Sequence, residues 1–311
     1  MLALHTTRKQ ISLMSDLPEP ERGRGEVKVR VHYASLNPTD AEIVEGKLDL
    51  FFRLNRVRSE VLTGLEFSGI VMEGGGRFSA GDRVFGYTHL FKGPKTHQDV
   101  VSIPETYIAH VPDGMSLAEA AAFPLGAQTS LVALRDLAEL QHGQSVLING
   151  ASGGLGLLAI QIARSLGARV NAIAGPAGQD VMTEMGAESV FDYHQTSLSE
   201  MDGSFDVVLE LSGRARFEDF RHLMTPDGIY IPAEPQKELV SFLGNPFRRQ
   251  KLGYLLVDRG DTKLLSELAG QVERGELKTT PPRTFAFSDF SQAFASLKKP
   301  GRIGRIVLRL Q

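Results

Sequence analysis

Residues 145–167, SVLINGASGGLGLLAIQIARSLG, decide the fold of this chain, because they predict a strand, a glycine-rich turn and a helix in succession. Residues 146–148 form a short apolar run, which is typical of a strand buried on both faces. Apolar residues then recur at three- and four-residue steps over 155–166, and Gly167 can end that helix in a left-handed conformation. We therefore expect the glycines to lie where a strand leads into a helix N-terminus.

This placement matches a turn that binds the pyrophosphate of a dinucleotide. Such a turn needs one small residue for the bend, a second so that backbone can approach the phosphates, and a third for close helix–strand packing. The helix N-terminus adds unpaired N–H groups and a positive dipole end. An ordinary glycine-rich connection is the alternative, and the strand–helix units downstream argue against it. The three positions are Ala151, Gly153 and Gly156, and we also expect Ser152, Gly154 and Leu155 to contact the cofactor.

The composition is typical of a globular protein with room for two domains. The chain has 311 residues, 42% of them hydrophobic and 23% charged, with a net charge of −3. This charge argues against a nucleic-acid surface. No apolar run approaches the ~18 residues of a membrane span, and residues 1–9 lack the apolar stretch of a signal peptide. We therefore expect a cytoplasmic protein.

Cysteine is absent from the chain, which excludes disulfides, thiolate nucleophiles and cysteine-ligated zinc. Eight histidines remain, and no two of them lie within a helical turn of each other. A histidine metal site would have to be assembled from distant segments, so we expect no bound metal.

Most of the chain before Ser116 predicts β-structure. In residues 26–36, valines alternate with charged residues, the period-two pattern of a half-buried strand. No helix follows the glycine triplet 74–76, so we interpret it as a turn and not as a phosphate loop. Residues 37–60 predict loop and helix able to border a pocket. Further strands are expected at 69–73, 82–87, 100–103 and 107–111.

The pattern changes at Ser116, which forms a capping box with Glu119 and predicts a helix to about residue 123. A second helix is expected at about 128–140. Strands and helices then alternate, as in a parallel sheet covered on both faces, whose ligands bind at the carboxyl ends of the strands. The later strands are expected at 169–174, 189–191, 207–211 and 228–231, and helices near 179–185 and 216–223.

The C-terminal part returns to short strands. Residues 262–274 predict an amphipathic helix, 283–287 a strand, 288–299 a helix capped by Ser288, and 304–310 a closing strand. We expect this tail to rejoin the first domain. The predicted domains are therefore residues 1–118 with 270–311, and residues 119–269.

Several blocks of the chain, in this order, resemble the medium-chain dehydrogenase/reductases, in the zinc-independent quinone oxidoreductase-like (zeta-crystallin-like) branch. The resemblance covers essentially the whole chain. It implies an α/β fold: a Rossmann doubly wound parallel sheet plus a GroES-like β domain split between the N- and C-terminal segments. The blocks are LNPTD (36–40), GLEFSG (64–69), GDRVFG (81–86), NGASGGLG (149–156), FDY (191–193) and GRIVL (304–308).

Zinc-dependent members of this family have a cysteine at the position of Asn37 and a histidine at that of Leu65. Without a zinc ion to act as a Lewis acid, the remaining candidate substrates are those that are already electron-poor. The resemblance therefore implies hydride transfer to a quinone or an α,β-unsaturated carbonyl.

The predicted cofactor is NADPH. Rossmann folds that bind NAD carry an acidic residue at the end of the second strand, and this strand ends instead at Ala174 and Gly175. The resemblance places Tyr193 near the 2′-phosphate of NADPH, and we hypothesise that its hydroxyl binds that phosphate. Arg305 or Arg302 could add positive charge, although a solvated arginine is the alternative.

The resemblance implies positions for four further residues. Asn37 and Thr129 would border the nicotinamide as catalytic positioning residues, while Ser212 and Gly213 would lie along the cofactor. The alternatives are a turn-stabilising role for Asn37 and a helix-capping role for Thr129.

The tyrosine that donates a proton in enoyl-thioester reductases is replaced by Leu48. Tyr87 or His89 could act instead, but a tyrosine at a strand end more often serves packing. Residues 46–60 and about 235–256 are expected to border the substrate pocket. Phe51, Phe52, Phe242 and Phe247 in these loops favour an apolar or aromatic ligand, unless they are core residues.

The resemblance also implies a homodimer joined at an edge of the Rossmann domain. Two other functions stay open at this point. The chain could be an NADPH-binding structural or regulatory protein with little turnover, or an alcohol dehydrogenase with an unusual metal site.

Overall fold

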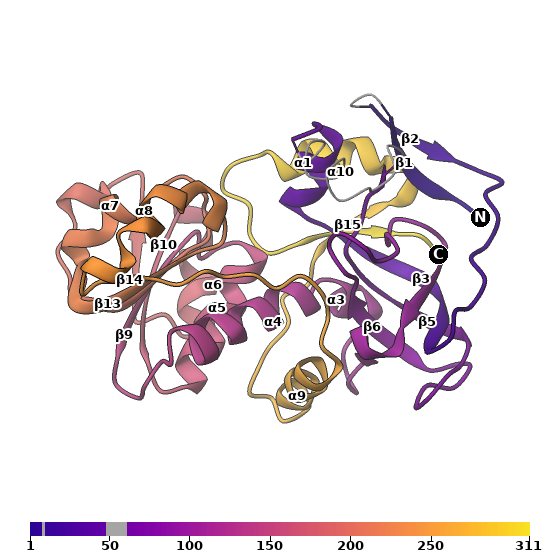
Figure 1. The fold of residues 1–311 in the computed structure, drawn as a ribbon, viewed down its shortest axis with the longest axis horizontal. Helices are drawn as coiled ribbons and strands as arrows, with labels where there is room; N and C mark the ends of the chain where they lie inside the picture. The colour runs from indigo at the N-terminus through magenta and orange to yellow at the C-terminus, as the bar shows by residue number, and fades with distance from the viewer. Residues whose placement is uncertain (8–9, 48–60) are drawn as a thin grey trace.

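The computed structural model describes residues 1–7, 10–47 and 61–311, which form two lobes (Figure 1). One lobe is built on a six-stranded sheet, and the other holds a seven-stranded and a three-stranded sheet. Both chain termini lie in the second lobe, since the C-terminal segment returns to it. The predicted α/β class and the split of the second lobe are confirmed.

The six-stranded sheet has the order β11-β10-β9-β12-β13-β14, and every neighbouring pair is parallel. All five residues of β9 are buried, as expected for an apolar run at the centre of a sheet covered on both faces. The strands are β9 (Ser145–Asn149), β10 (Arg169–Ala174), β11 (Ser189–Asp192), β12 (Phe205–Glu210), β13 (Met224–Pro232) and β14 (Lys251–Leu252).

Helices cover this sheet, with α5 following β9 as predicted. The helix predicted over about 128–140 is present but begins and ends earlier: α4 has Pro124 in its first turn, and a π-helical turn, η2 (Val132–Leu137), continues it. Residues 126–131 are all buried, so no apolar stripe marks this helix. The helices of this lobe are α4 (Pro124–Leu131), α5 (Gly154–Ser165), α6 (Gln179–Met185), α7 (Phe217–Phe220) and α8 (Leu239–Leu243), while α3 (Leu117–Ala121) packs against β3, β5 and β6 of the other lobe.

The seven-stranded sheet has the order β15-β16-β3-β5-β6-β8, with β7 paired to β3. Its C-terminal strand β16 is antiparallel to β3, with Ile306 opposite Leu36, so the tail rejoins the first part of the chain as predicted. The strands are β3 (Glu26–Leu36), β5 (Glu66–Glu73), β6 (Arg83–Tyr87), β7 (Val100–Pro104), β8 (Ile108–His110), β15 (Arg283–Ala286) and β16 (Ile306–Arg309).

Smaller elements differ from the predictions. The sheet of β1 (Ala3–Thr7), β2 (Gln10–Met14) and β4 (Val61–Leu62) was not anticipated, and 235–256 is not only loop, since it contains α8 and β14. Helix α10 (Phe290–Leu297) follows a 3-10 turn, η8 (Phe287–Asp289), so the N-cap of the helix is Asp289 and not Ser288. Helix α1 (Pro38–Val44) occupies part of the predicted loop-and-helix region.

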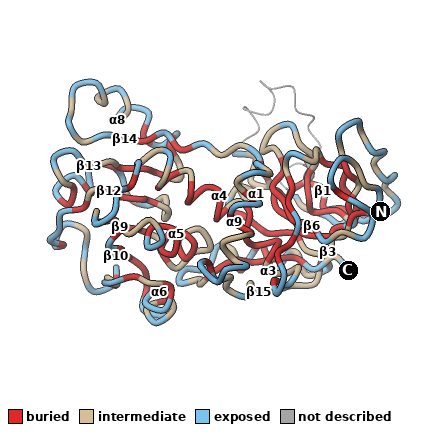
Figure 2. The backbone as a smooth tube through the Cα atoms, turned by 90° about the horizontal axis from the view of Figure 1, so that it is seen from below, coloured by how far each residue is buried: buried red, intermediate tan, exposed pale blue. Residues whose placement is uncertain are grey.

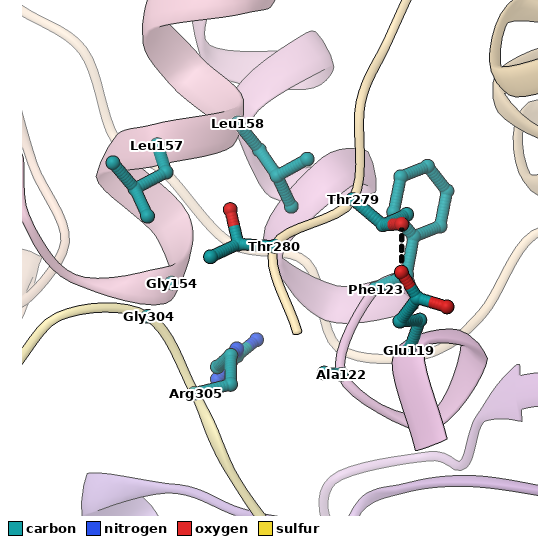
Figure 3. Close-up of a pocket in the computed structure, with 10 residues that line it drawn as sticks. All are labelled: Glu119, Ala122, Phe123, Gly154, Leu157, Leu158, Thr279, Thr280, Gly304 and Arg305. Atoms are coloured by element: carbon teal, nitrogen blue, oxygen red, sulfur yellow. Dashed lines mark hydrogen bonds between the residues drawn. The ribbon is translucent and has the colours of Figure 1, made fainter. Parts of the chain in front are cut away.

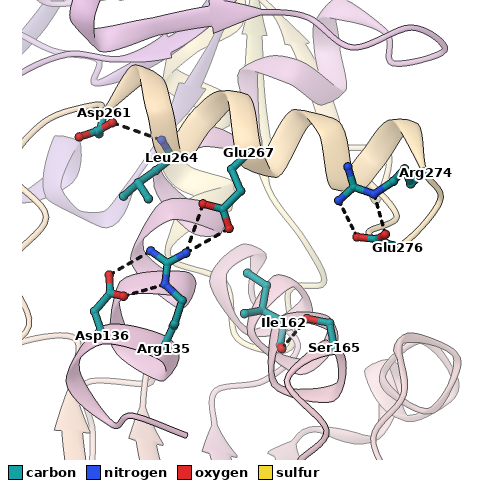
Figure 4. A network of polar contacts seen from close by, with 9 residues as sticks. All are labelled: Arg135, Asp136, Ile162, Ser165, Asp261, Leu264, Glu267, Arg274 and Glu276. Atoms are coloured by element: carbon teal, nitrogen blue, oxygen red, sulfur yellow. Dashed lines mark hydrogen bonds and ion pairs between the residues drawn. The ribbon is translucent and has the colours of Figure 1, made fainter.

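Helix α9 (Thr262–Glu273) runs beside α4 and η2 (Figure 4). Its N-cap Asp261 accepts hydrogen bonds from the backbone of Lys263 and Leu264, as expected for an aspartate cap. On the helix, Glu267 pairs with Arg135 of η2 at 3.0 Å. Buried residues run through both lobes (Figure 2), and one apolar cluster includes strands of each. None of the described helices combines the length and apolar character that crossing a bilayer requires.

Candidate active site

A cavity of about 480 Å³ lies between the two lobes, at the carboxyl end of β9. Its wall combines the glycine turn before α5, the loop between β3 and α1, and the segment that follows β14. Apolar side chains of Leu65, Leu125 and Leu155 contribute to it, together with polar groups of Asn37 and Thr129. This is the edge of a parallel sheet at which ligands bind.

The glycine turn has the geometry that the sequence predicts. Gly150 has φ of +82°, and Gly153, Gly154, Leu155 and Gly156 line the cavity, so backbone lies open at the N-terminus of α5. A Cβ atom on Gly156 would stand 2.4 Å from the carbonyl oxygen of Ala151, which explains the need for glycine there. Such a cradle fits a dinucleotide pyrophosphate.

The remaining members of the turn face other parts of the protein. Ala151 is fully buried, and its small side chain belongs to the apolar core. The carbonyl oxygen of Ser152 accepts a hydrogen bond from the backbone of Gly304 at 2.9 Å. The turn is therefore tied directly to the C-terminal tail.

Asn37 is 1% exposed and belongs to a buried network that joins three segments of chain. Its Nδ2 donates to Glu66 at 3.0 Å, and its Oδ1 accepts from Arg305. Glu66 also pairs with Arg305 at 3.1 Å and accepts from the backbone of Leu125 at 2.8 Å. The amide of Asn37 is therefore held in one orientation at the cavity wall. The backbone of Asn37 still serves the turn, since its N–H donates to Asp40 at 2.8 Å.

Arg305 spans the boundary between the cavity and a small pocket of about 20 Å³ behind it (Figure 3). Its stem packs on Gly154, where an added Cβ would stand 2.3 Å from the arginine Cγ. Its Nε is buried without a partner in the described chain. On the far side of the small pocket, Thr279 donates to Glu119 at 2.6 Å. The guanidinium predicted to assist a phosphate is thus already paired with Glu66.

Thr129 lies inside α4 and not at its N-cap, which is Phe123, so the helix-capping alternative is wrong. The threonine is 8% exposed, and its Oγ1 has no hydrogen-bond partner among the described residues. Because an unpaired buried hydroxyl is unfavourable, this atom fits contact with a ligand in the cavity.

Tyr193, which was predicted to lie near the 2′-phosphate, follows β11 and lies beside the end of β10. Its backbone N–H donates to the carbonyl of Ala174 at 3.3 Å, and its hydroxyl would stand 3.1 Å from a Cβ on Gly175. Tyr193 is 39% exposed. No carboxylate ends β10, whose last residue is Ala174.

Ser212 and Gly213 surround a carboxylate that sequence reasoning missed. Glu210, which ends β12, is 2% exposed and accepts from Ser212 Oγ at 2.6 Å, the Gly213 backbone at 2.7 Å and Asn149 at 2.5 Å. Burial raises the pKa of Glu210, and these hydrogen bonds oppose the rise. The sequence feature that could have revealed Glu210 is its position as a glutamate at the end of an apolar strand.

The two alternative proton donors are already engaged. Tyr87 lines the cavity, but its hydroxyl donates to the carbonyl of Val257 at 3.1 Å, and burial raises its pKa. His89 does not line the cavity and lies 3.5 Å from Asp258. Burial lowers the pKa of His89, against the effect of Asp258.

Other predicted pocket residues occupy varied places. Arg302 lines the cavity, donates to the carbonyl of Leu297 at 2.7 Å and has a buried Nε without a partner in the described chain. Phe242 and Phe247 do not line it, and Phe247 is 91% exposed. Leu48, Phe51 and Phe52 lie outside the described residues. Leu90 and Phe91, which the sequence did not single out, do line the cavity.

The described residues contain no cluster of three or more histidine, cysteine, aspartate or glutamate side chains able to hold a metal ion. At the two positions where the resemblance implies zinc ligands in zinc-dependent members, this chain carries an amide, Asn37, and an apolar side chain, Leu65, and both line the cavity.

Comparison with known proteins identifies the family. The alcohol dehydrogenase GroES-like domain matches residues 23–130, and the zinc-binding dehydrogenase family matches residues 185–308. Together these matches cover most of the chain, which belongs to the medium-chain dehydrogenase/reductase superfamily and is similar to quinone oxidoreductases.

Two solved structures share the whole fold. The quinone oxidoreductase of Coxiella burnetii is 26% identical, with a TM-score of 0.88 over 100% of this chain and 99% of that one. The quinone oxidoreductase of Thermus thermophilus, whose complex with NADPH is also known, is 27% identical, with a TM-score of 0.72 over 100% of both chains.

Similar sequences occur in single enzymes and in large synthases. The NADPH-dependent alkenal/one oxidoreductase of Arabidopsis thaliana is 25% identical over 96% of this chain and 75% of that protein. Erythronolide synthase EryA2 of Saccharopolyspora erythraea is 31% identical over 94% of this chain, which spans only 8% of the synthase.

Proposed function

We infer that this protein is a zinc-independent, NADPH-dependent reductase that transfers hydride to a quinone or an α,β-unsaturated carbonyl. The observation that carries the proposal is the cavity itself. It joins an open glycine turn to apolar walls, and an amide and a leucine stand where related enzymes hold zinc. An electron-poor substrate needs no Lewis acid to accept hydride, so this wall suits it.

The site fits a nicotinamide dinucleotide. The glycine turn would take the pyrophosphate, and the unpaired Thr129 Oγ1 and the fixed Asn37 amide would border the nicotinamide. When bound, the reduced cofactor supplies hydride. The protein would contribute orientation of the substrate and exclusion of water.

A preference for NADPH over NADH is supported by the end of β10. Ala174 and Gly175 offer no carboxylate to repel a 2′-phosphate, and the Tyr193 hydroxyl lies beside them. The alkenal/one reductase relative is NADPH-dependent, and the Thermus thermophilus relative binds NADPH, which agrees with this preference.

Oxidation of NADPH and NADH, followed by the absorbance of the reduced nicotinamide, tests this proposal directly. The acceptors are 1,4-benzoquinone, 9,10-phenanthrenequinone and a simple enone. We expect saturable turnover with NADPH and much slower turnover with NADH. Tight NADPH binding without turnover of any acceptor would instead support a structural or regulatory role, and stoichiometric zinc in the purified protein would revive the alcohol dehydrogenase hypothesis.

We also propose that the two domains are residues 1–118 with 270–311, and residues 119–269.

We further propose a homodimer that forms at the open edge of β14. Among the described residues, β14 pairs only with β13, and α8 beside it exposes Leu239, Val240 and Leu243. Pairing of two β14 edges would cover this surface. Sedimentation of the wild type and of a Val240→Glu/Leu243→Glu variant tests it.

A further inference from the structure

Helix α1 turns one carboxylic acid toward the cavity. Pro38, Thr39 and Glu42 all line it, and their spacing of three and four residues places them on one face of the helix. The opposite face is buried, with Ile43 in the core and Asp40 accepting hydrogen bonds from the backbone of Asn37 and Gly64. Hydrogen bonds of Asp40 therefore fix the N-terminal end of α1, and Glu42 lies at the cavity wall further along the helix.

Glu42 is the unpaired acid of the cavity wall. Throughout the described ranges, no hydrogen-bond donor or cation pairs with its carboxyl group. The other carboxylate of the wall, Glu234, is paired with Lys237 at 2.6 Å. Tyr87 is engaged with Val257. Among the described residues that line the cavity, Glu42 is thus the acid free to reach a substrate.

The surroundings of Glu42 raise its pKa, chiefly through burial. Glu234 across the cavity raises this pKa further, with a smaller contribution from Glu45. Lys47 and Lys237 act in the opposite direction. Glu45, three residues further along, shows the contrast: hydrogen bonds with Lys298 and Lys47 lower its pKa to about 2.

We propose that Glu42 is the proton donor of this site, and that the substrate class it serves is the α,β-unsaturated carbonyl. This rests on the proposed reductase function. An enone that accepts hydride at its β-carbon loses its C=C bond and becomes an enolate, which must gain a proton to give the saturated carbonyl compound. A reduced quinone can take protons from water, so a dedicated acid is of use chiefly for enones.

The step balances with one hydride and one proton. The substrate gains a hydride, that is, one proton and two electrons, at the β-carbon from the reduced nicotinamide. The Glu42 carboxyl then breaks its O–H bond and protonates the α-carbon or the enolate oxygen. The resulting carboxylate takes a proton from solvent, so one substrate, one reduced nicotinamide and one proton give the saturated product and oxidised nicotinamide.

The central experiment compares Glu42→Gln with the wild type on an enone and on 1,4-benzoquinone. Glutamine keeps the size and polarity of the side chain but has no acidic proton. We expect enone turnover to fall by about 10²–10⁴-fold, the contribution of a general acid, while quinone turnover falls no more than about fivefold. The affinity for NADPH, measured by nicotinamide fluorescence, should stay within about twofold of the wild type.

Glu45→Gln is the control for a neighbouring carboxylate, because Glu45 does not line the cavity and has only the smallest effect on the pKa of Glu42. It should leave both activities close to those of the wild type and shift the pH profile only slightly to lower pH. The pH profile gives a second readout. The wild-type enone rate should be highest while Glu42 is protonated and should fall as pH rises through its raised pKa. Glu234→Gln should shift this fall to lower pH, since it removes the negative charge that faces Glu42.

A measurement without turnover completes the test. Carbon-13 NMR of glutamate-labelled protein without cofactor, with the Glu42 resonance assigned by its loss in Glu42→Gln, should show a pKa above that of an ordinary glutamate. Wild-type enone turnover in Glu42→Gln, equal loss with both acceptors, or a wild type that reduces only quinones would each overturn the inference alone. A wild type that reduces neither acceptor would overturn the proposed function.

Discussion

At the residue scale, the buried cation of Lys95 makes the stability of the protein depend on pH. Lys95 is 7% exposed, and its ammonium donates to the carbonyl of Leu90 at 2.6 Å. Burial lowers the pKa of Lys95 to about 8, against the opposite effect of Asp40. The unfolded chain therefore binds more protons than the folded one between this value and the ordinary lysine pKa, and stability rises with pH across that interval.

We predict that Lys95→Met stabilises the protein near neutral pH by up to ~3 kcal/mol, the free energy that corresponds to the lowered pKa. The gain should shrink as pH rises above about 8, because the wild-type lysine then becomes neutral in the folded state. Urea unfolding over a pH series measures both effects. The exposed Lys92→Met serves as control, and a gain that does not change with pH would contradict burial of the ammonium as its cause.

Tyr193 carries the prediction for cofactor choice. If its hydroxyl binds the 2′-phosphate through a charge-assisted hydrogen bond, Tyr193→Phe should weaken NADPH by about ten- to hundredfold and leave NADH nearly unchanged. Fluorescence titration with each cofactor measures this. Equal loss of affinity for both would remove Tyr193 from that role and point to a change in the sheet edge at Gly175.

At the scale of elements, Gly156 and Gly153 of the glycine turn differ in what an added side chain would contact. A Cβ on Gly156 would meet the backbone of Ala151 at 2.4 Å, whereas one on Gly153 would lie 3.4 Å from the Gly150 carbonyl, an ordinary contact. We predict that Gly156→Ala destabilises the protein by about 1–3 kcal/mol through overpacking. Gly153→Ala should change stability by less than about 0.5 kcal/mol.

Cofactor binding should respond differently from stability. Gly153 lines the cavity, so a methyl group there would obstruct a pyrophosphate although the fold accepts it. Isothermal titration with NADPH should show weakened binding in Gly153→Ala despite its unchanged unfolding midpoint. Wild-type affinity in this variant would mean that the pyrophosphate does not approach Gly153.

Elements with a strong local period were predictable. Strand β9 is wholly buried, and α5 has a clear apolar face, so both were placed from sequence, together with the strand–helix alternation after them. Strand β14 has two residues, too few for any period. Strand β1 pairs with the neighbouring strand β2 and with the distant β4, and this small sheet was not predicted. Helix α4 was misplaced because burial on nearly all sides removes the apolar stripe.

The site was predictable where a family motif fixes a position, and not where distant residues pair. Asn37, Thr129 and the glycines lie on the cavity that the sequence implied. Glu66 was missed, although it joins Asn37 to Arg305, since this network forms only when segments 29 and 239 residues apart meet. Glu42 was missed for the same reason: only the folded structure shows that its carboxyl group lies at the cavity wall without a hydrogen-bond or ion-pair partner among the described residues.

At the scale of the whole molecule, the buried ion pair of Glu66 and Arg305 connects β5 of the seven-stranded sheet to the C-terminal segment just before β16. Glu66 is fully buried and Arg305 is 8% exposed. Glu66 also binds the start of α4 through Leu125, and the stem of Arg305 lies on Gly154 of the turn. A single ion pair therefore holds together elements that belong to both lobes.

We predict that Glu66→Leu and Arg305→Met each destabilise the protein by about 3–5 kcal/mol, because each leaves an uncompensated charge in the interior. The double variant should lose less than the sum, since no buried charge remains, and the difference gives the coupling between the two residues. Urea unfolding of the four proteins measures it. The exposed pair Arg249 and Asp227 is the control, because breaking it should leave the unfolding midpoint unchanged. Losses that simply add in the double variant would show that Glu66 and Arg305 stabilise the two lobes independently, each through its own backbone and packing contacts.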